Sequence, residues 1–226
     1  MTKATSGKSR LPNNRESLLT AAARHFALQG ISGTNLKSIA SEVGVSAPAI
    51  YYHFESKEQL AFEAFHWAMS EFNEYVRART ASTDPTLRMA ESVRAHVQFK
   101  LQRPEIAMAY SVLMGTSDRL QDFNAEYRGS LKSLEREYYN FLHRTVDAGL
   151  AAGQFHAAVP SLPVFAIISM CEHVPTWFSP AGPLSIEEVS KNFADYALGI
   201  LKATPEDRLR AADWLAVLTR ESGGRA

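Results

Sequence analysis

Residues 36–53 read LKSIASEVGVSAPAIYYH and are the most informative part of the chain. Apolar residues recur at helical spacing on both sides of Gly44, so the pattern predicts two short amphipathic helices joined by a tight turn. Asn35 and Ser46 are residue types that cap helix N-termini, and glycine readily adopts the left-handed backbone that ends a helix. Pro48 falls in the first turn of the second helix, where its missing N–H does little harm.

A glycine-containing turn between two short helices is typical of a helix-turn-helix, in which the second helix projects from the domain. An α-helix fits the major groove of B-DNA, so the outer face of that helix can reach base edges. Helical hairpins of this kind also occur in all-α proteins that do not bind DNA, so the pattern alone leaves a purely structural hairpin open. The face expected to be exposed holds Ser46, Ala47, Ala49, Tyr52 and His53.

The rest of the chain also shows helical periodicity, without sustained β-type alternation and without an Asn-Gly or Asp-Gly hairpin turn. Helix starts are predicted at the capping boxes that begin with Ser56 and Ser185, and at Asp84-Pro85. The fold class is therefore predicted to be all-α. Three longer helices are predicted, over 119–152, 162–177 and 184–202.

The composition fits a soluble globular protein: the 226 residues are 46% hydrophobic and 21% charged. A single cysteine, Cys171, excludes an intramolecular disulfide and argues against a cysteine-based zinc site. The longest apolar run is too short to span a bilayer, and no apolar segment follows the N-terminus as in a signal peptide. We therefore expect a cytoplasmic protein that makes no membrane contact.

Charge is unevenly distributed along a chain whose formal net charge is zero. Residues 1–60 hold seven Lys or Arg against four acidic residues, so the remainder is net negative. A basic N-terminal part on an acidic body favours contact between that part and a polyanion. The polar residues 1–13, with Lys3, Lys8 and Arg10, are expected to form a flexible basic arm.

Catalytic motifs are missing from the sequence. It has no Gly-x-Ser-x-Gly, no glycine-rich phosphate loop and no His-Glu-x-x-His. Glu63 and His66 have the spacing found in carboxylate di-iron bundles, but no second copy of the pair exists. We therefore predict a protein that is not an enzyme, with no catalytic residue, no metal and no cofactor.

Residues 15–60 resemble the N-terminal domain of the TetR/AcrR (tetracycline-repressor-like) family of transcriptional regulators. Asn35 departs from the second Thr usual in that family, but Asn caps helices equally well. The resemblance implies a helix-turn-helix DNA-binding domain over 14–60 and a helical ligand-binding and dimerisation domain over 61–226. The residues that carry it are Arg15, Leu18-Leu19, Ala21-Ala22, Phe26, Gly30, Gly33-Thr34, Ile39-Ala40, Val43-Gly44-Val45-Ser46, Ile50-Tyr51-Tyr52-His53-Phe54, Ser56-Lys57-Glu58 and Leu60.

The resemblance also implies which residues contact double-stranded DNA. Thr34 and the cap of the next helix are expected to touch phosphate through hydroxyl and backbone N–H groups. Ala47 and Ala49 offer only apolar contacts, so base readout is expected to depend partly on DNA shape. The DNA-binding candidates are Thr34, Asn35, Lys37, Ser46, Ala47, Pro48, Ala49, Tyr51, Tyr52, His53 and Lys57.

Three of these residues have an equally simple structural interpretation. Tyr51 is as well suited to the core of the small domain as to a contact with DNA. His53 can simply cap or pack the end of its helix. Lys57 can be an ordinary solvated lysine near the capping box.

Most members of the family are homodimers, and here the helices over 162–177 and 184–202 would form the dimer interface. A dimer places two recognition helices about one duplex turn apart and so reads a pseudo-palindromic operator. The expected exposed apolar edge consists of Val164, Ile168, Val189, Phe193, Tyr196 and Ile200.

The family's effector pocket is expected to be rich in aromatic residues, which suits a small apolar or aromatic molecule. Aromatic residues at helical spacing are also ordinary core residues, and this interpretation stays open. Residues 177–185 resemble a stretch of family members that sense acyl thioesters. The effector-binding candidates are Trp67, Phe99, Tyr110, Met114, Phe123, Tyr127, Tyr138, Phe141, His173 and Trp177.

Together these features predict a ligand-responsive transcriptional regulator, specifically a repressor that a small effector releases from its operator. One alternative is an activator of the same family. The other is an all-helical carrier or enzyme whose helix pair does not function in DNA binding.

Overall fold

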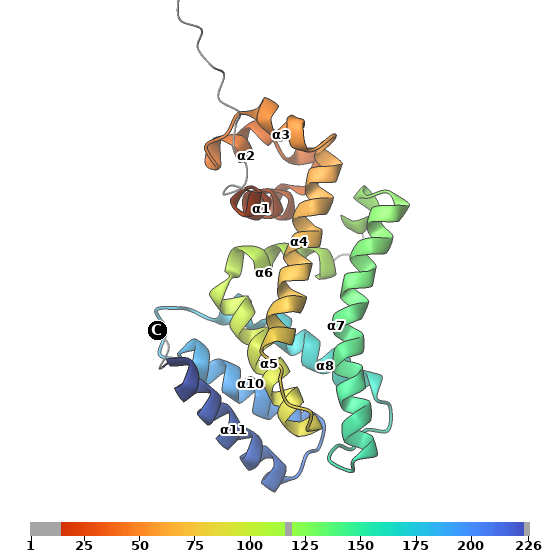
Figure 1. The fold of residues 1–226 in the computed structure, drawn as a ribbon, viewed down its shortest axis with the longest axis vertical. Helices are drawn as coiled ribbons and strands as arrows, with labels where there is room; N and C mark the ends of the chain where they lie inside the picture. The colour runs from red at the N-terminus through yellow and green to blue at the C-terminus, as the bar shows by residue number, and fades with distance from the viewer. Residues whose placement is uncertain (1–14, 116–118, 224–226) are drawn as a thin grey trace, which may run out of the picture. The chain divides into compact units, whose positions relative to one another are not determined.

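The computed structural model describes residues 15–115 and 119–223, without the side chains of 110–115, 119–120 and 221–223. The described residues are helical with short connections (Figure 1), which confirms the all-α prediction. The predicted basic arm, 1–13, lies outside the described residues. The helices are α1 (Arg15–Gly33), α2 (Leu36–Glu42), α3 (Ala47–His53), α4 (Lys57–Ala78), α5 (Pro85–Gln102), α6 (Pro104–Gly115), η1 (Arg119–Asp122), α7 (Ala125–Ala151), α8 (Ser161–Glu172), α9 (Val174–Trp177), α10 (Ile186–Ile200) and α11 (Pro205–Gly223).

The chain forms two compact units. The first combines Met1–Ala68 with Met108–Leu131, and the second combines Met69–Ala107 with Lys132–Ala226. α4, α6 and α7 each contribute residues to both units. A single boundary after residue 60, as expected from the sequence, therefore does not separate the two compact units.

In the first unit, α1, α2 and α3 pack around a small apolar core. Leu19, Ile39 and Ile50, one from each helix, are at most 1% exposed. The ring of Phe26 on α1 lies 6.5 Å from that of Phe65 on α4, which holds the start of α4 against the core. Burial of such side chains supplies most of the stability of a domain this small.

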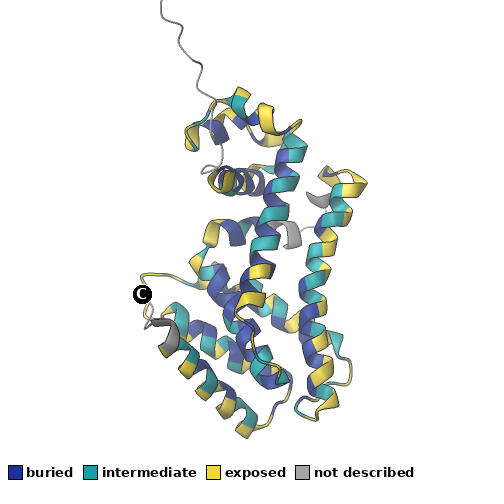
Figure 2. Ribbon diagram, in the orientation of Figure 1, coloured by how far each residue is buried: buried dark blue, intermediate teal, exposed yellow. Residues whose placement is uncertain are grey.

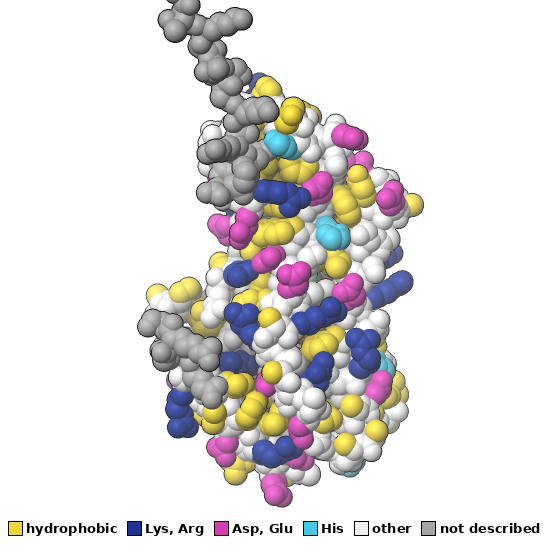
Figure 3. All heavy atoms as spheres, in the orientation of Figure 1, with side chains coloured by type: hydrophobic (Ala, Val, Ile, Leu, Met, Phe, Trp, Pro, Cys, Tyr) yellow, Lys and Arg dark blue, Asp and Glu magenta, His cyan; other side chains and the backbone are white. Residues whose placement is uncertain are grey.

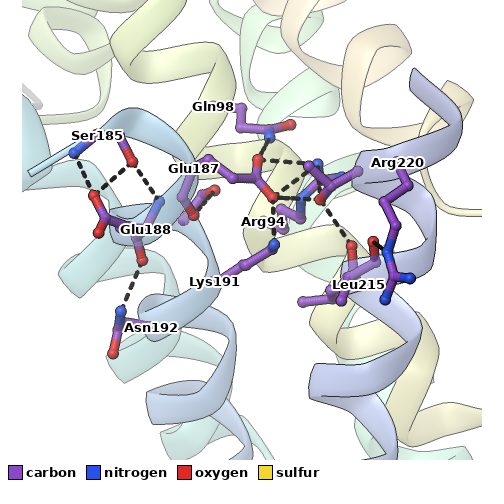
Figure 4. Close-up of polar contacts among 12 residues, drawn as sticks. Arg94, Gln98, Ser185, Glu187, Glu188, Lys191, Asn192, Leu215 and Arg220 are labelled. Carbon is purple, nitrogen blue, oxygen red and sulfur yellow. Dashed lines mark hydrogen bonds and ion pairs between the residues drawn. The ribbon is translucent and has the colours of Figure 1, made fainter. Parts of the chain in front are cut away.

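In the second unit, α5 lies beside α10, and α11 packs on both of them (Figure 1). α10 and α11 each bury one face and expose the other, whereas α5 is buried along most of its length (Figure 2). Glu187 on α10 joins the three helices through polar contacts (Figure 4). Its carboxylate accepts from Gln98 Nε2 at 2.9 Å, from Arg94 Nη2 at 3.0 Å and from Thr219 Oγ1 at 2.6 Å. Burial opposes ionisation of Glu187, but the hydrogen bonds from Thr219 and Arg94, together with the Arg94 charge, outweigh it and lower the pKa of Glu187.

Several predicted helix starts are confirmed. Asp84 caps α5 by accepting from Leu87 N, and Pro85 follows at the first helical position. Ser185 and Glu188 form the reciprocal capping box of α10. Ser56 Oγ accepts from Gln59 N at 3.0 Å, but the Gln59 side chain accepts from Glu55 N rather than from the capping residue.

Two of the predicted long helices are wrong in their extent. The helix over 162–177 ends at Glu172 and resumes as α9, because Pro175 has no N–H to continue the ladder. In place of a helix over 119–152, the short η1 precedes α7. Asn124 accepts from Tyr127 N at 2.9 Å and so provides a new start for α7.

Candidate nucleic-acid interface and effector region

The turn between α2 and α3 has the predicted construction. Asn35 Oδ1 accepts from Lys37 N at 2.9 Å, and Ser46 Oγ accepts from Ala49 N at 3.3 Å. Gly44 has a φ of 70°, in the left-handed region that favours glycine. Val45 N donates to Ala40 O at 2.9 Å and closes the turn. Short-range hydrogen bonds thus fix where α3 begins.

The C-terminal end of α3 presents aromatic side chains to solvent. Ile50 and Phe54 are 1% and 4% exposed and anchor the helix, whereas Tyr51 and Tyr52 are 57% and 85% exposed. The rings of Tyr52 and His53 meet edge to face, 5.0 Å apart, and His53 is also exposed. Tyr51 is therefore a surface residue in the described chain and not a core residue.

Thr34 requires a correction. It was expected to offer its hydroxyl to DNA, but it is only 4% exposed. Its Oγ1 donates to Gly30 O at 2.6 Å, so the hydroxyl is used inside the connection between α1 and α2. The backbone at Gly30 is non-helical, with a φ of 73°, so the Gly30 carbonyl can accept this hydrogen bond in place of one within the helix.

Lys57 has a structural role that neither interpretation of the sequence anticipated. Its Nζ donates to Ser32 O at 2.9 Å and to Thr34 O at 3.2 Å. An ammonium on carbonyls at a helix C-terminus satisfies acceptors that the helix leaves open. The side chain is half-buried and ties the start of α4 to the end of α1.

The cations of the first unit differ in their availability. Glu42 forms an ion pair with Arg24 and lies 2.9 Å from His25 Nε2. The hydrogen bond from His25, together with Arg24, lowers the pKa of Glu42 against the effect of burial. Lys37, by contrast, is exposed and has no ion-pair partner within the described ranges. On the face seen in Figure 3, basic and acidic side chains are interspersed and form no continuous basic surface. A lysine or arginine that can meet DNA is therefore an individual residue without an acidic partner.

The remaining DNA-binding candidates lie at the surface of α2 and α3. Lys37 lies in the first turn of α2, and the first turn of α3 carries the small side chains of Ala47, Pro48 and Ala49. Asn35, Ser46 and Pro48 are exposed, and Ala47 and Ala49 are half-buried. The structure thus gathers two helix N-termini and the end of α3 in one unit, with Thr34 turned inward.

The effector candidates fall into separate groups. In the second unit Phe99, Tyr138 and Phe141 are buried, and the rings of Phe99 and Tyr138 lie 5.3 Å and 4.7 Å from that of Phe72. His173 and Trp177 are exposed, Trp177 by 51%.

The other effector candidates belong to the first unit. Phe123 is buried, and Tyr127 stacks on Phe62 with ring centres 4.1 Å apart. Trp67 is half-buried. The side chains of Tyr110 and Met114 lie outside the described residues.

A buried polar cluster lies against the Phe72 group and was not predicted. His96 and Lys100 on α5 are fully buried and both contact Glu172 at the end of α8. His96 Nδ1 lies 2.8 Å from the hydroxyl of Tyr138. The available signal was the spacing of His96 and Lys100, which places them on one helix face, but the same spacing is usual on solvated faces.

Residues of the described ranges form no group of three or more His, Cys, Asp or Glu able to hold a metal ion. In that same part of the chain, none of the helices combines the length and apolarity that crossing a bilayer requires.

The apolar edge expected for dimerisation is partly wrong. Val164 and Val189 are 0% and 4% exposed, so both belong to the core of their own chain. The exposed apolar side chains of this region are Leu162, Phe165, Trp177, Leu184, Tyr196 and Ile200. A helix that is apolar on two faces gives the same periodicity for either, and only packing decides which face is covered.

Comparison with known proteins gives matches along most of the chain. The model of bacterial regulatory proteins of the tetR family matches residues 18–64, and that of the tetracyclin repressor-like C-terminal domain matches residues 82–201. The HTH-type transcriptional repressor KstR2 of Mycolicibacterium smegmatis is 24% identical over 201 residues, which are 87% of this chain and 94% of that protein.

Solved structures share the fold. PfmR of Thermus thermophilus, a TetR family transcriptional regulator, is 25% identical with a TM-score of 0.68, covering 82% of this chain and 97% of its own. AibR, crystallised with isovaleryl coenzyme A and operator DNA, is 23% identical with a TM-score of 0.67, covering 82% and 96%. The first matched range contains α2 and α3, and the second contains the buried cluster of His96, Lys100 and Glu172.

Proposed function

This chain belongs to the tetR family of bacterial regulatory proteins and is a DNA-binding transcriptional repressor, not an enzyme, and we propose that a small effector controls its release from DNA. The proposal rests on α3, whose C-terminal end is exposed while Ile50 holds the helix in the core. A helix held by Ile50 with Tyr52 and His53 outward is suited to the major groove.

Operator contact in this proposal involves Lys37, the N-termini of α2 and α3, and the aromatic end of α3. Lys37 contacts the phosphate backbone, because it is exposed and has no acidic partner in the described part of the chain. The N-termini of α2 and α3 present backbone N–H groups to phosphate. Tyr51, Tyr52 and His53 contact the backbone and base edges, and Lys57 positions α4 rather than touching DNA.

The operator is pseudo-palindromic in this proposal because the repressor acts as a homodimer. Exposed apolar side chains on α8 and α10 support a dimer through these helices: Phe165 is 56% exposed, Tyr196 53% and Ile200 37%. Monomeric proteins seldom expose several large apolar side chains on two helices that pack together, as α8 and α10 do. Two recognition helices about one duplex turn apart then read both half-sites.

The effector is a small apolar molecule, with an acyl thioester as the class to test first. The buried rings of Phe72, Phe99 and Tyr138 supply apolar surface, and His96 and Lys100 supply buried polar groups beside it. Such groups would match a ligand with an apolar chain and a polar carbonyl. The AibR complex with isovaleryl coenzyme A supports the choice of thioesters.

Regulation follows from a shift between two populations of the repressor. α4 is continuous from Lys57 to Ala78 and contributes to both compact units. An effector that binds one arrangement of α4 more tightly than another shifts the repressor toward that arrangement. The free energy of operator binding can change by no more than the difference between the effector's binding free energies for the two arrangements, and a large release needs a difference of about a few kcal/mol.

The test is fluorescence anisotropy with a labelled operator, selected from random duplex DNA on the purified full chain. With 6–10 phosphate contacts, affinity should fall by about 10³–10⁵ between 50 and 200 mM salt. Addition of isovaleryl coenzyme A and longer acyl thioesters should then release the operator, with free coenzyme A as the control. Affinity that does not change with salt would contradict DNA binding, and unchanged affinity with every thioester would contradict the effector class.

A further inference from the structure

A cleft of about 270 Å³ lies between the start of α5 and the second half of α7, within the second unit. One arginine from each helix lines it, and none of the described lining residues is acidic. We propose that this cleft binds the phosphate group of a small phosphorylated molecule. The residues that line it are Thr83, Pro85, Arg88, Phe141, Arg144, Thr145 and Ala148.

Contacts within the chain hold Arg88 in place and leave some of its N–H donors available to a ligand. Its guanidinium lies 4.9 Å over the ring centre of Phe141, and Nη1 donates to Ser82 O at 3.2 Å. A guanidinium has five N–H donors in a planar fork, so one backbone hydrogen bond leaves several for a ligand. Stacking on an aromatic face restricts the side chain before any ligand arrives, which reduces the entropy lost on binding.

Carboxylates do not neutralise this pair of arginines. Neither Arg88 nor Arg144 has an ion-pair partner among the residues that the structure describes. The acids nearest in sequence are engaged elsewhere. Asp84 pairs with Arg210 at 3.0 Å, and Asp147 lies 2.9 Å from His143 Nδ1.

The charge and size of the cleft favour a phosphate ester over a carboxylate. A phosphate monoester carries about −1.5 to −2 at pH 7 and three acceptor oxygens, which two guanidinium groups match. A carboxylate would match only one. The Thr83 hydroxyl can add a donor, whereas that of Thr145 already donates to Phe141 O at 3.1 Å. The volume lies just below the lower end of the range of about 300–1,000 Å³ typical of ligand sites, so it suits a phosphate and a few further atoms.

The experiment is a ³¹P NMR titration of glycerol 3-phosphate with the full-length protein at low ionic strength, without DNA. We expect line broadening that saturates with protein and that inorganic phosphate reverses. Acetate at equal ionic strength should not reverse it. R144Q should weaken binding by about tenfold, because it removes one charge-assisted contact. Arg144 is exposed and forms no ion pair or hydrogen bond with the residues that the structure describes, so the variant should fold normally.

The matched control is R136Q, which removes another exposed arginine of α7 and changes the net charge equally. It should leave the titration unchanged, and R88K should weaken binding because a lysine lacks the planar fork. Equal broadening in R144Q and R136Q, or reversal by acetate as readily as by phosphate, would overturn the proposal. The titration involves neither operator nor thioester, so its outcome is separate from that of the proposed function.

Discussion

The ammonium of Lys100 lies 2.6 Å from Oε2 of Glu172, and the lysine side chain is fully buried. The other carboxylate oxygen, Oε1, lies 3.1 Å from Nε2 of His96. A single carboxylate at the end of α8 therefore partners two buried groups of α5. Removing charges from water is costly, and the pair is tolerated because each charge has a partner at hydrogen-bond distance.

Glu172→Gln should destabilise the protein by about 3–5 kcal/mol, because it leaves the Lys100 charge buried without its counter-charge. Urea unfolding followed by circular dichroism measures the change. The control is Glu137→Gln, which breaks the exposed pair with Arg77 and should cost less than about 1 kcal/mol. Equal effects of the two variants would show that the buried pair does not contribute as described.

Stability should fall as the pH is lowered from about 6.5. Burial lowers the pKa of His96 below its ordinary 6.5 despite the hydrogen bond with Glu172. The unfolded chain then takes up a proton that the folded protein does not, so stability present above pH 6.5 is lost below it. Urea unfolding between pH 7.5 and 5 measures this slope, and His96→Gln should flatten it.

A second loss should follow in more acidic solution. Burial opposes ionisation of Glu172, but the Lys100 charge and the hydrogen bond with His96 outweigh it and lower the pKa of Glu172 to about 2, from 4.5. The stability from this ionised carboxylate is complete above about pH 4.5 and disappears toward pH 2. In Glu172→Gln the slope between these pH values should be smaller, and an unchanged slope would argue against the assignment.

Tyr52→Ala should weaken operator binding by about tenfold, or about 1.4 kcal/mol, without changing the stability. The side chain is 85% exposed and its ring contacts that of His53, so the fold does not depend on it. Operator anisotropy and thermal unfolding on the same samples provide the two measurements. Retained affinity in this variant would exclude the end of α3 from the DNA interface.

Lys37→Ala and Lys57→Ala should behave differently. Loss of Lys37 should reduce the slope of log affinity against log salt by about 0.9 per lost phosphate contact, with stability unchanged. Loss of Lys57 should cost about 1 kcal/mol of stability, because two backbone carbonyls lose their donor. If Lys57→Ala altered only the salt slope, Lys57 would be a phosphate contact after all.

Tyr196→Glu should convert a homodimer into monomers and abolish tight operator binding, because a charge would be buried without a partner in the interface. Leu209→Glu on α11 is the control, since Leu209 is 65% exposed against 53% for Tyr196. Light scattering coupled to size-exclusion chromatography distinguishes the two states. A dimer that persists in Tyr196→Glu would place the interface elsewhere.

Local sequence signals were enough to predict the helix-turn-helix and most helix starts. Asn35, Ser46, Asp84 and Ser185 cap their helices as expected, and Gly44 adopts the left-handed turn. These features depend on hydrogen bonds and backbone angles within about one helical turn, so the local residues suffice to specify them.

Which side chains face inward depends on packing between distant segments and could not be predicted from local signals. Lys100 is buried because Glu172, 72 residues further along the chain, supplies its counter-charge. The Thr34 hydroxyl turns inward to Gly30, and Lys57 reaches carbonyls at the end of α1. Val164 is covered while Phe165 beside it is exposed. In each case the outcome depends on partners brought together by packing, and a helical period in the sequence is compatible with either face.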